Sequence, residues 1–196
     1  MKTIINEIVN EIIINKSRFI TVVIPINKIE DINTKIDILK MIYKDATHYC
    51  FAYIIDSKEK CEDDGEPSGT AGLPILNVLK NNDLTNILCV VIRYFGGIKL
   101  GSGGLIRAYS SSVKEAIKQA KIGHIEKGYE IDIEFDYDNM KKMDYFLKDL
   151  DIKKIFDEKI IYTFKISEKN YNNIKDIIKN YGNILNIKNI NIIKGD

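Results

Sequence analysis

The sequence predicts an α+β fold that is divided into two domains, over residues 1–125 and 129–196. Three observations support this prediction. Strand-like segments, in which apolar and polar residues alternate, are interleaved with segments whose apolar residues recur every three or four positions, as on one face of a helix. The alternation starts afresh after Gly128. The chain has 196 residues, of which 45% are hydrophobic, so it is long enough to bury two small cores.

The elements of the first domain are predicted in chain order. A hairpin comes first, with strands over Thr3–Ile14 and Phe19–Ile24 and a turn at Lys16–Arg18. The following elements are a helix over Lys28–Tyr43, a strand over Thr47–Ile55, a charged loop over Lys58–Gly72, a helix that begins near Thr70, a central strand over Asn86–Phe95, a glycine loop over Gly96–Gly104, and a long helix whose apolar face runs from Leu105 to Ala120.

The second domain is predicted to follow a hinge that Gly123 and Gly128 bracket. Its predicted order is strand, helix, strand, strand, helix, strand, which is typical of ferredoxin-like domains. The elements are strands over Tyr129–Tyr137, Ile152–Phe156, Lys159–Ile166 and Ile184–Ile193, a helix capped by Asp138, and a helix from Glu168 to Gly182.

The composition restricts the possible partners. The formal net charge is +1, so any RNA contact must be local. No segment approaches the roughly 20 consecutive apolar residues of a membrane span, and Glu7 and Glu11 stand where a signal peptide would be apolar, so we expect a cytoplasmic protein that binds no membrane. The three cysteines lack metal-type spacing, which predicts reduced thiols, and we expect neither a metal nor a cofactor.

The glycine loop has the features of an anion-binding turn. Backbone N–H groups in a glycine turn that leads into a helix converge on an anion. Arg93 and Arg107 flank the loop, and Lys99 lies on it. Ser102 stands where a P-loop has its phosphate-binding lysine, which argues against hydrolysis of nucleoside triphosphates. The alternative interpretation is that the glycines serve only tight turning and packing, and that the arginines pair with carboxylates.

The acidic loop supplies possible partners for these cations. Glu62, Asp63, Asp64 and Glu66 lie within five positions of one another. Paired carboxylates also hold divalent metals or act as acid and base, but the spacing of a calcium loop is missing. We therefore favour a loop that is solvated or that pairs with the two arginines.

Candidate nucleophiles are present: a thiol at Cys50 with His48 as its base, and the hydroxyls of Ser68, Thr70 and residues 110–112, to which no base is assigned. His48 and Cys50 share one face of a predicted strand, where their neighbours Ala52 and Ile54 favour a core position. Capping and surface roles are sufficient for Ser68, Thr70 and the serines at 110–112. The catalytic residues, if there are any, are left unassigned.

Four motifs in fixed order resemble the YigZ/IMPACT family. They are KSRF (Lys16–Phe19), ATHYCFAY (Ala46–Tyr53), DDGEPSGTAG (Asp63–Gly72) and VVIRYFGGIKLGSGGLIRAY (Val90–Tyr109). The domain after Gly128 is similar to the extra C-terminal domain of the bacterial YigZ-type members. The motif positions that the resemblance carries over are Lys16, Arg18, His48, Asp63, Asp64, Glu66, Ser68, Thr70, Arg93, Lys99 and Arg107.

The resemblance implies a fold and a cellular process. It implies an N-terminal domain with the left-handed βαβ topology of a small-subunit ribosomal protein and of domain IV of elongation factor G, in which the acidic and glycine loops meet at one side of the sheet. Eukaryotic relatives are translational regulators that occupy a large activator of the kinase that senses amino-acid starvation. They carry a different accessory domain, so this partner is not inferred here.

The resulting hypothesis is a non-enzymatic, translation-associated regulatory protein that binds the ribosome or RNA in a polar cleft. Asp63–Thr70 and Tyr94–Arg107 would form the cleft. Cations and loop amides would hold a phosphate, Tyr94 would stack on a base, and the acids would orient the cations. The predicted ligand-binding residues are Arg93, Tyr94, Lys99, Ser102, Arg107, Asp63, Asp64, Glu66, Ser68, Thr70, Lys16, Arg18 and His48.

Two alternatives remain open at this point. The first is an enzyme, a hydrolase or transferase, that acts on a small phosphorylated or carboxylated substrate in the same cleft. The second is a regulatory module that binds a protein partner in translation control. Nothing in the sequence indicates specificity for DNA.

Overall fold

The structure, a computed structural model, describes residues 1–195 and confirms the α+β class. The chain forms two compact units. The first unit comprises Met1–His124 together with Gly195, and the second unit comprises Ile125–Lys194. Among the described residues, no helix combines the length and the apolar character needed to cross a membrane.

The first unit is built on a five-stranded sheet in the order β2-β3-β6-β4-β5. Every neighbouring pair is antiparallel, so β3 and β4, which α1 connects, run parallel with β6 between them. The elements are β2 (Ile8–Ile14), β3 (Ser17–Pro25), α1 (Asp31–Ile42), β4 (His48–Ile55), β5 (Lys58–Glu62), α2 (Gly72–Asn81), β6 (Ile87–Tyr94) and α3 (Gly101–Lys118).

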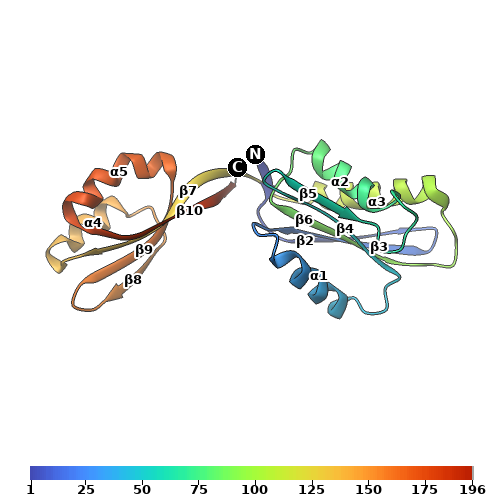
Figure 1. Ribbon diagram of the computed structural model, residues 1–196, viewed down its shortest axis with the longest axis horizontal. Helices are drawn as coiled ribbons and strands as arrows, with labels where there is room; N and C mark the ends of the chain where they lie inside the picture. Colours follow the sequence, from blue (N-terminus) through green and yellow to red (C-terminus); the bar gives the residue numbers. More distant parts are fainter. Residues whose placement is uncertain (196) are drawn as a thin grey trace. The chain divides into compact units, whose positions relative to one another are not determined.

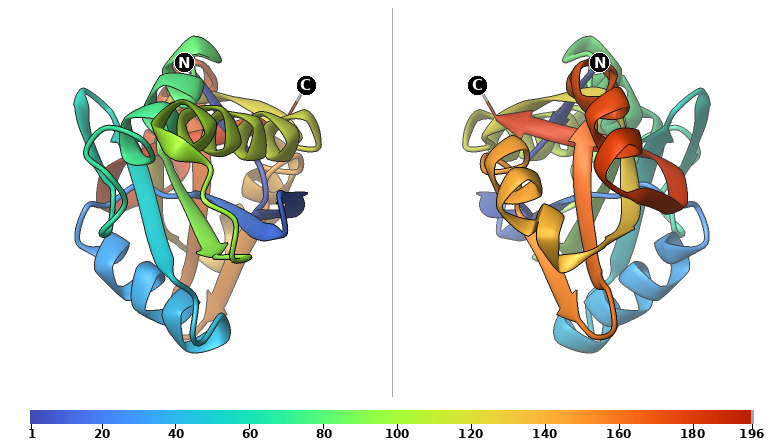
Figure 2. Two further views of the ribbon diagram at one scale, coloured as in Figure 1. Left: turned by 90° about the vertical axis from the view of Figure 1, so that its right-hand side faces the viewer. Right: turned by 90° about the vertical axis from the view of Figure 1, so that its left-hand side faces the viewer.

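Helices cover both faces of this sheet. Helix α1 lies on one face, and α2 and α3 lie side by side on the other (Figures 1 and 2). The central strand β6 is buried from Ile87 to Arg93, because its side chains alternate between two apolar clusters. Cys89 and Val91 face α2 and α3, whereas Leu88 and Val90 face α1. The prediction of a central strand from its continuous apolar run is therefore confirmed.

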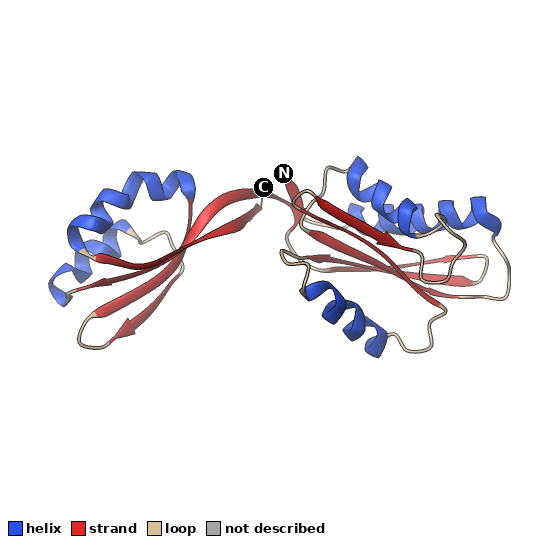
Figure 3. Ribbon diagram, in the orientation of Figure 1, coloured by secondary structure: helices blue, strands red, loops and turns tan. Residues whose placement is uncertain are grey.

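The second unit has the predicted strand-helix-strand-strand-helix-strand order. Its strands are hydrogen-bonded in the order β10-β7-β9-β8, and α4 and α5 cover the same face (Figure 3). The elements are β7 (Ile122–Phe135), a 3-10 turn (Tyr137–Asn139), α4 (Met140–Phe146), β8 (Ile152–Phe156), β9 (Ile160–Ser167), α5 (Glu168–Tyr181) and β10 (Asn183–Gly195).

Two predictions about the N-terminal region are wrong. The expected strand Thr3–Ile14 is two strands, because β1 (Lys2–Ile4) pairs with the start of β7 whereas β2 pairs with β3. The predicted turn at Lys16–Arg18 lies one residue earlier, since Asn15 and Lys16 have the positive φ angles and Ser17 already belongs to β3.

Several other predicted boundaries also differ. Residues 58–62, expected in a loop, form β5, because they complete a hairpin with β4. The segment bracketed by Gly123 and Gly128, predicted as a hinge, is continuous strand, and the boundary between the two units falls within it. Helix α2 begins at Gly72 instead of near Thr70, and Asp138 lies in the 3-10 turn and makes no capping bond to α4.

We predict that truncating Leu88, which has no exposed surface and packs on the α1 side of β6, destabilises the protein strongly. Leu88→Ala should lower the free energy of unfolding by about 2–5 kcal/mol, because it removes buried methyl groups and leaves a cavity. Leu73→Ala, at a position that is 47% exposed on α2, should cost less than about 0.5 kcal/mol. Urea denaturation followed by circular dichroism measures both, and equal costs would contradict the assignment.

Candidate functional site

One cleft in the first unit brings the acidic loop and the glycine loop together. Its volume is about 450 Å³. It contains five of the predicted ligand-binding residues: His48, Glu66, Arg93, Lys99 and Ser102. The other lining residues are Thr47, Pro67, Phe95, Leu100, Gly101 and Leu105. We call this hollow the Arg93 cleft.

The sheet register places the two strand residues of the cleft side by side. His48, the first residue of β4, is the direct partner of Arg93 near the end of β6. Arg93 points to the α2–α3 face, like Val91 two positions earlier. Its side chain is therefore carried underneath the acidic loop that follows β5.

The centre of the cleft is a buried ion pair. Nη1 of Arg93 donates to Oε1 of Glu66 at 2.5 Å, and the two side chains are only 6% and 4% exposed. The same carboxylate oxygen accepts the hydroxyl of Tyr109 from α3 at 2.8 Å. Nη2 of Arg93 reaches the hydroxyl of Ser17 at 3.4 Å. The pairing of this arginine with the acidic loop, one of the interpretations left open by the sequence, is what the structure shows.

One donor of this arginine has no acceptor. The Nε atom of Arg93 is buried and has no hydrogen-bond partner among the described residues. An unpaired N–H of a charged group in a buried position carries a desolvation cost. The guanidinium also lies over the rings of Phe19 and Phe95, at 5.4 and 5.5 Å from their centroids.

Cys50 is a buried free cysteine. Burial is the main reason that the pKa of its thiol is raised to about 12; the hydrogen bond to Tyr109 acts against it, and the carboxylates of Glu66 and Asp64 act in the same direction as burial. Burial, and after it the neighbouring Cys50 and Glu66, raises the pKa of Tyr109. Nδ1 of His48 lies 2.8 Å from the carbonyl oxygen of Asp64, so this nitrogen carries the proton and donates it. A thiol that remains protonated at neutral pH is a poor nucleophile, which disfavours a catalytic pair of Cys50 and His48.

Asp63 organises the acidic loop instead of contacting a cation. Its carboxylate accepts the backbone N–H groups of Gly69, Ala71 and Gly72 at 2.7, 3.0 and 2.8 Å. Burial of this carboxyl raises its pKa, but the three donors together outweigh burial and hold the pKa below its ordinary value. The loop thereby closes over the start of α2.

Two further residues of this loop also serve its conformation. The Asp64 carboxylate accepts the backbone N–H of Tyr49 at 2.6 Å. The hydroxyl of Thr70 donates to the carbonyl of Pro67 at 2.6 Å. Ser68 is exposed and lies outside the lining of the cleft. Of the acids expected to orient cations, only Glu66 does so.

The glycines of the second loop have distinct roles. A side chain at Gly96 would collide with the backbone of Lys16 and Ser17, so this glycine allows the loop to lie against the β2–β3 turn. Gly97 and Gly101 have φ angles of +85° and +68°, which favour glycine. Gly103 has no such requirement, and a Cβ there would lie 3.7 Å from Nη1 of Arg107.

The amino end of α3 opens onto the cleft. No side chain caps this end, and its first turn contains no acidic residue. The first N–H groups of a helix have no partner within the helix, and they carry partial positive charge. Gly101 and Ser102 line the cleft at this end, next to the exposed Lys99.

The remaining predicted residues lie outside the cleft. Tyr94 points to the α1 face, where its hydroxyl donates to the carbonyl of Lys44 at 3.0 Å. Arg18 lies over the ring of Tyr94 and pairs with Glu11. Lys16 is in the β2–β3 turn, and Arg107 lies along the first turns of α3.

The sequence analysis chose Tyr94 as the aromatic ring that stacks on a base, and it did not single out Phe95. Phe95 lines the cleft and is 45% exposed. Strand alternation gives the signal, because residues 93 and 95 share a face that residue 94 does not.

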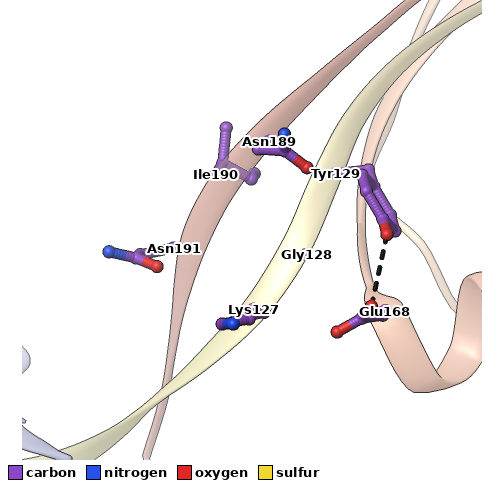
Figure 4. Close-up of a pocket in the computed structure, with 7 residues that line it drawn as sticks. All are labelled: Lys127, Gly128, Tyr129, Glu168, Asn189, Ile190 and Asn191. Atoms are coloured by element: carbon purple, nitrogen blue, oxygen red, sulfur yellow. Dashed lines mark hydrogen bonds between the residues drawn. The ribbon is translucent and has the colours of Figure 1, made fainter.

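The second unit has a hollow of similar volume, about 460 Å³, with a different character (Figure 4). Its lining residues are Lys127, Gly128, Tyr129, Glu168, Asn189, Ile190 and Asn191. The hydroxyl of Tyr129 already donates to Glu168, at 3.4 Å. Because the Arg93 cleft holds a buried charged group with an unused donor, it is the stronger candidate site. Within residues 1–195, no group of three or more His, Cys, Asp or Glu side chains is arranged to hold a metal ion.

We predict that breaking the buried ion pair from one side is more costly than removing it altogether. Glu66→Leu should lower the free energy of unfolding by about 3–5 kcal/mol, because Arg93 is left buried and unpaired. The double variant Glu66→Leu/Arg93→Met should be more stable than Glu66→Leu alone. Urea denaturation of Glu66→Leu, Arg93→Met and the double variant measures the coupling energy between the two side chains.

The exposed pair of Lys80 and Glu59, 3.0 Å apart, is the control. Glu59→Ala should cost less than about 1 kcal/mol. A Glu66→Leu variant as stable as Glu59→Ala would show that the buried pair does not hold the cleft together.

We further predict that Asp63→Asn destabilises the protein in a pH-dependent way. Because the pKa of Asp63 is lower in the folded than in the unfolded state, its contribution is complete above its ordinary pKa of 3.8 and is lost as the pH falls through the folded value. The variant should be about 1–3 kcal/mol less stable than the parent at pH 7, and this difference should shrink below pH 4. Urea denaturation at several pH values from 7 to below 4 measures this difference in stability, with Glu62→Gln, at an exposed position, as the control. A difference that is constant with pH would refute the role of the ionised carboxylate.

Comparison with known proteins places this site in a family. Residues 15–117 match the model of the family described as the Impact N-terminal domain. The chain is 49% identical over 121 residues to the IMPACT family member YvyE of Bacillus subtilis (strain 168), a match that covers 60% of this chain and 55% of that protein. It is 39% identical over 111 residues to the IMPACT family member YigZ of Escherichia coli (strain K12), covering 54% of each.

A solved structure extends the likeness to the second unit. The crystal structure of a hypothetical protein superimposes with a TM-score of 0.65 at 26% identity, covering 95% of this chain and 97% of that one. The sequence matches to the curated relatives span about half the length of those proteins. The motifs that form the Arg93 cleft all lie within residues 15–117, and the chain belongs to the Impact N-terminal domain family.

Proposed function

We propose that the chain is a translation-associated regulatory protein of the cytoplasm that binds ribosomal or other RNA through the end of the sheet that carries the Arg93 cleft. The observation that carries this proposal is the convergence of three connections at that end. The β2–β3 turn lies against Gly96, and Thr47, in the connection from α1 to β4, accepts the N–H of Phe95 at 3.0 Å. The glycine loop lies next to both.

The three connections, together with the start of β3 and the first turns of α3, carry cations that point to a local RNA contact. The exposed cations are Lys16, Arg18, Lys44, Lys99 and Arg107. Proteins hold RNA by phosphate contacts from such cations and from helix amino ends, and they stack unpaired bases on exposed aromatic rings. Phe95 supplies such a ring. A local patch of this kind is compatible with a formal net charge of only +1.

The enzyme alternative receives less support from the geometry. Each of the three acids of the loop already accepts hydrogen bonds from the protein, and the carboxylate of Glu66 is neutralised by Arg93. These contacts suit positioning roles better than proton transfer.

A protein-binding module is the second candidate, because α2 and α3 leave a shallow groove between them. Leu73 and Ile106 line it and are 47% and 43% exposed. Exposed apolar residues that adjoin in this way are typical of protein-binding surfaces.

We predict that reversing the charge of two cations, one in the glycine loop and one in α3, weakens ribosome binding. Lys99→Glu/Arg107→Glu should lower the affinity for ribosomes at least about tenfold, and the salt dependence of binding should become shallower by roughly 1.5–2 in log–log slope, because two phosphate contacts are lost. The measurement is co-sedimentation with ribosomes from the organism that makes this protein, at several salt concentrations.

The control variant is Lys35→Glu/Lys60→Glu, which makes the same charge change at exposed positions of α1 and β5. It should bind like the parent. If both variants bind equally well, the patch is not the RNA surface. If the parent itself does not co-sediment, the proposal fails, and the groove lined by Leu73 and Ile106 becomes the surface to test.

A further inference from the structure

The Arg93 cleft combines three features, and each of them is complementary to a different part of a nucleotide. The first is the amino end of α3. Its uncapped N–H groups and the neighbouring Lys99 provide the local excess of positive charge, because Glu66 already neutralises Arg93. A phosphate group suits this end of the cleft.

The second feature is the unused donor of Arg93. Nε is buried in a residue that is only 5% exposed and that lines the cleft, and it has no acceptor within residues 1–195. Because this atom has almost no accessible surface, a ligand oxygen reaches it only if the guanidinium shifts; the charge of Arg93 is balanced by Glu66, so a neutral oxygen, such as a base carbonyl or a ribose hydroxyl, would then satisfy the N–H without adding charge.

The third feature is the apolar part of the lining. Phe95, Leu100 and Pro67 line the cleft beside the charged groups, and the guanidinium of Arg93 lies over the Phe95 ring. A ring that is 45% exposed and fixed in this way offers a stacking surface for a flat heteroaromatic base.

We propose that the Arg93 cleft binds one unpaired nucleotide, with its phosphate at the amino end of α3 and its base against Phe95. The volume of about 450 Å³ is in the range of small-molecule sites and leaves no room for a base-paired duplex. The inference rests on the proposed function where the nucleotide belongs to a single-stranded RNA, and it specifies which part of that RNA the protein recognises. A free nucleoside monophosphate presents the same chemistry.

The test is a titration of the full-length, 15N-labelled chain followed by NMR. The probes are uridine 5′-monophosphate, uridine, inorganic phosphate and hexauridylate. We expect the monophosphate and the hexamer to shift the amide signals of Gly101–Gly104 and the side-chain Nε–H signal of Arg93. Uridine and inorganic phosphate should each bind at least about tenfold more weakly than the monophosphate, because each lacks one of the two contacts.

Two pairs of variants test the contacts separately. Ser102→Asp places a carboxylate in the first turn of α3, which favours the helix but repels a phosphate. Ser102→Asp should lower nucleotide affinity at least about tenfold without lowering the melting temperature. Ser102→Asn, whose new side chain has the shape of aspartate without its charge, should retain most of the binding. Phe95→Ala should weaken binding roughly fivefold or more, and Phe95→Leu, which keeps the apolar bulk without the ring, should weaken it similarly.

The two sources of the nucleotide are distinguished by the probes. Binding of hexauridylate at least about tenfold tighter than the monophosphate identifies an RNA chain as the ligand, and equal affinities identify a free mononucleotide.

Other outcomes overturn the inference. If inorganic phosphate binds as tightly as the monophosphate, the cleft is a simple anion site and the base contact is wrong. If neither nucleotide moves the signals of the cleft while ribosome co-sedimentation still depends on Lys99 and Arg107, the nucleotide site is refuted and the proposed function stands. If the monophosphate binds but the ribosome does not, the proposed function fails and the nucleotide site remains.

Discussion

The buried ion pair between Arg93 and Glu66 is the interaction on which the candidate site depends. It joins the end of β6 to the acidic loop, and the same carboxylate receives the hydroxyl of Tyr109 from α3. Separating the two charges would leave one of them buried without a partner, which costs far more than an exposed pair contributes. The loop therefore keeps one position over the sheet, and the cleft exists because that position is kept.

The second constraint is the close approach of the glycine loop to the β2–β3 turn. Gly96 permits this approach, since a side chain there would collide with the Lys16 backbone. Gly97 and Gly101 then turn the chain so that α3 begins beside the cleft, with its N–H groups uncapped. Turn geometry and anion binding are thus not competing explanations of these glycines, because the turn is what aims the helix end.

The polar side chains of the four sequence motifs fall into two groups according to what they contact. Asp63, Asp64 and Thr70 bond to the backbone and hold the loop in shape. Lys99 and Ser102 line the cleft, where the proposed ligand would meet them. This division separates the groups that shape the loops from those that a proposed anion would contact, in a chain with little net charge.

Periodicity alone determined the α+β class, the central position of Asn86–Phe95 and the order of elements in the second unit, because burial imposes a period of two on strands and of about 3.6 on helices. Only the tertiary structure decided which partner each polar side chain takes: that Arg93 binds Glu66, that Asp63 binds backbone N–H groups, and that Glu66 also accepts the hydroxyl of Tyr109. The reason is physical, since these contacts join residues 6 to 43 positions apart, and no local pattern records which of several nearby donors an acceptor meets.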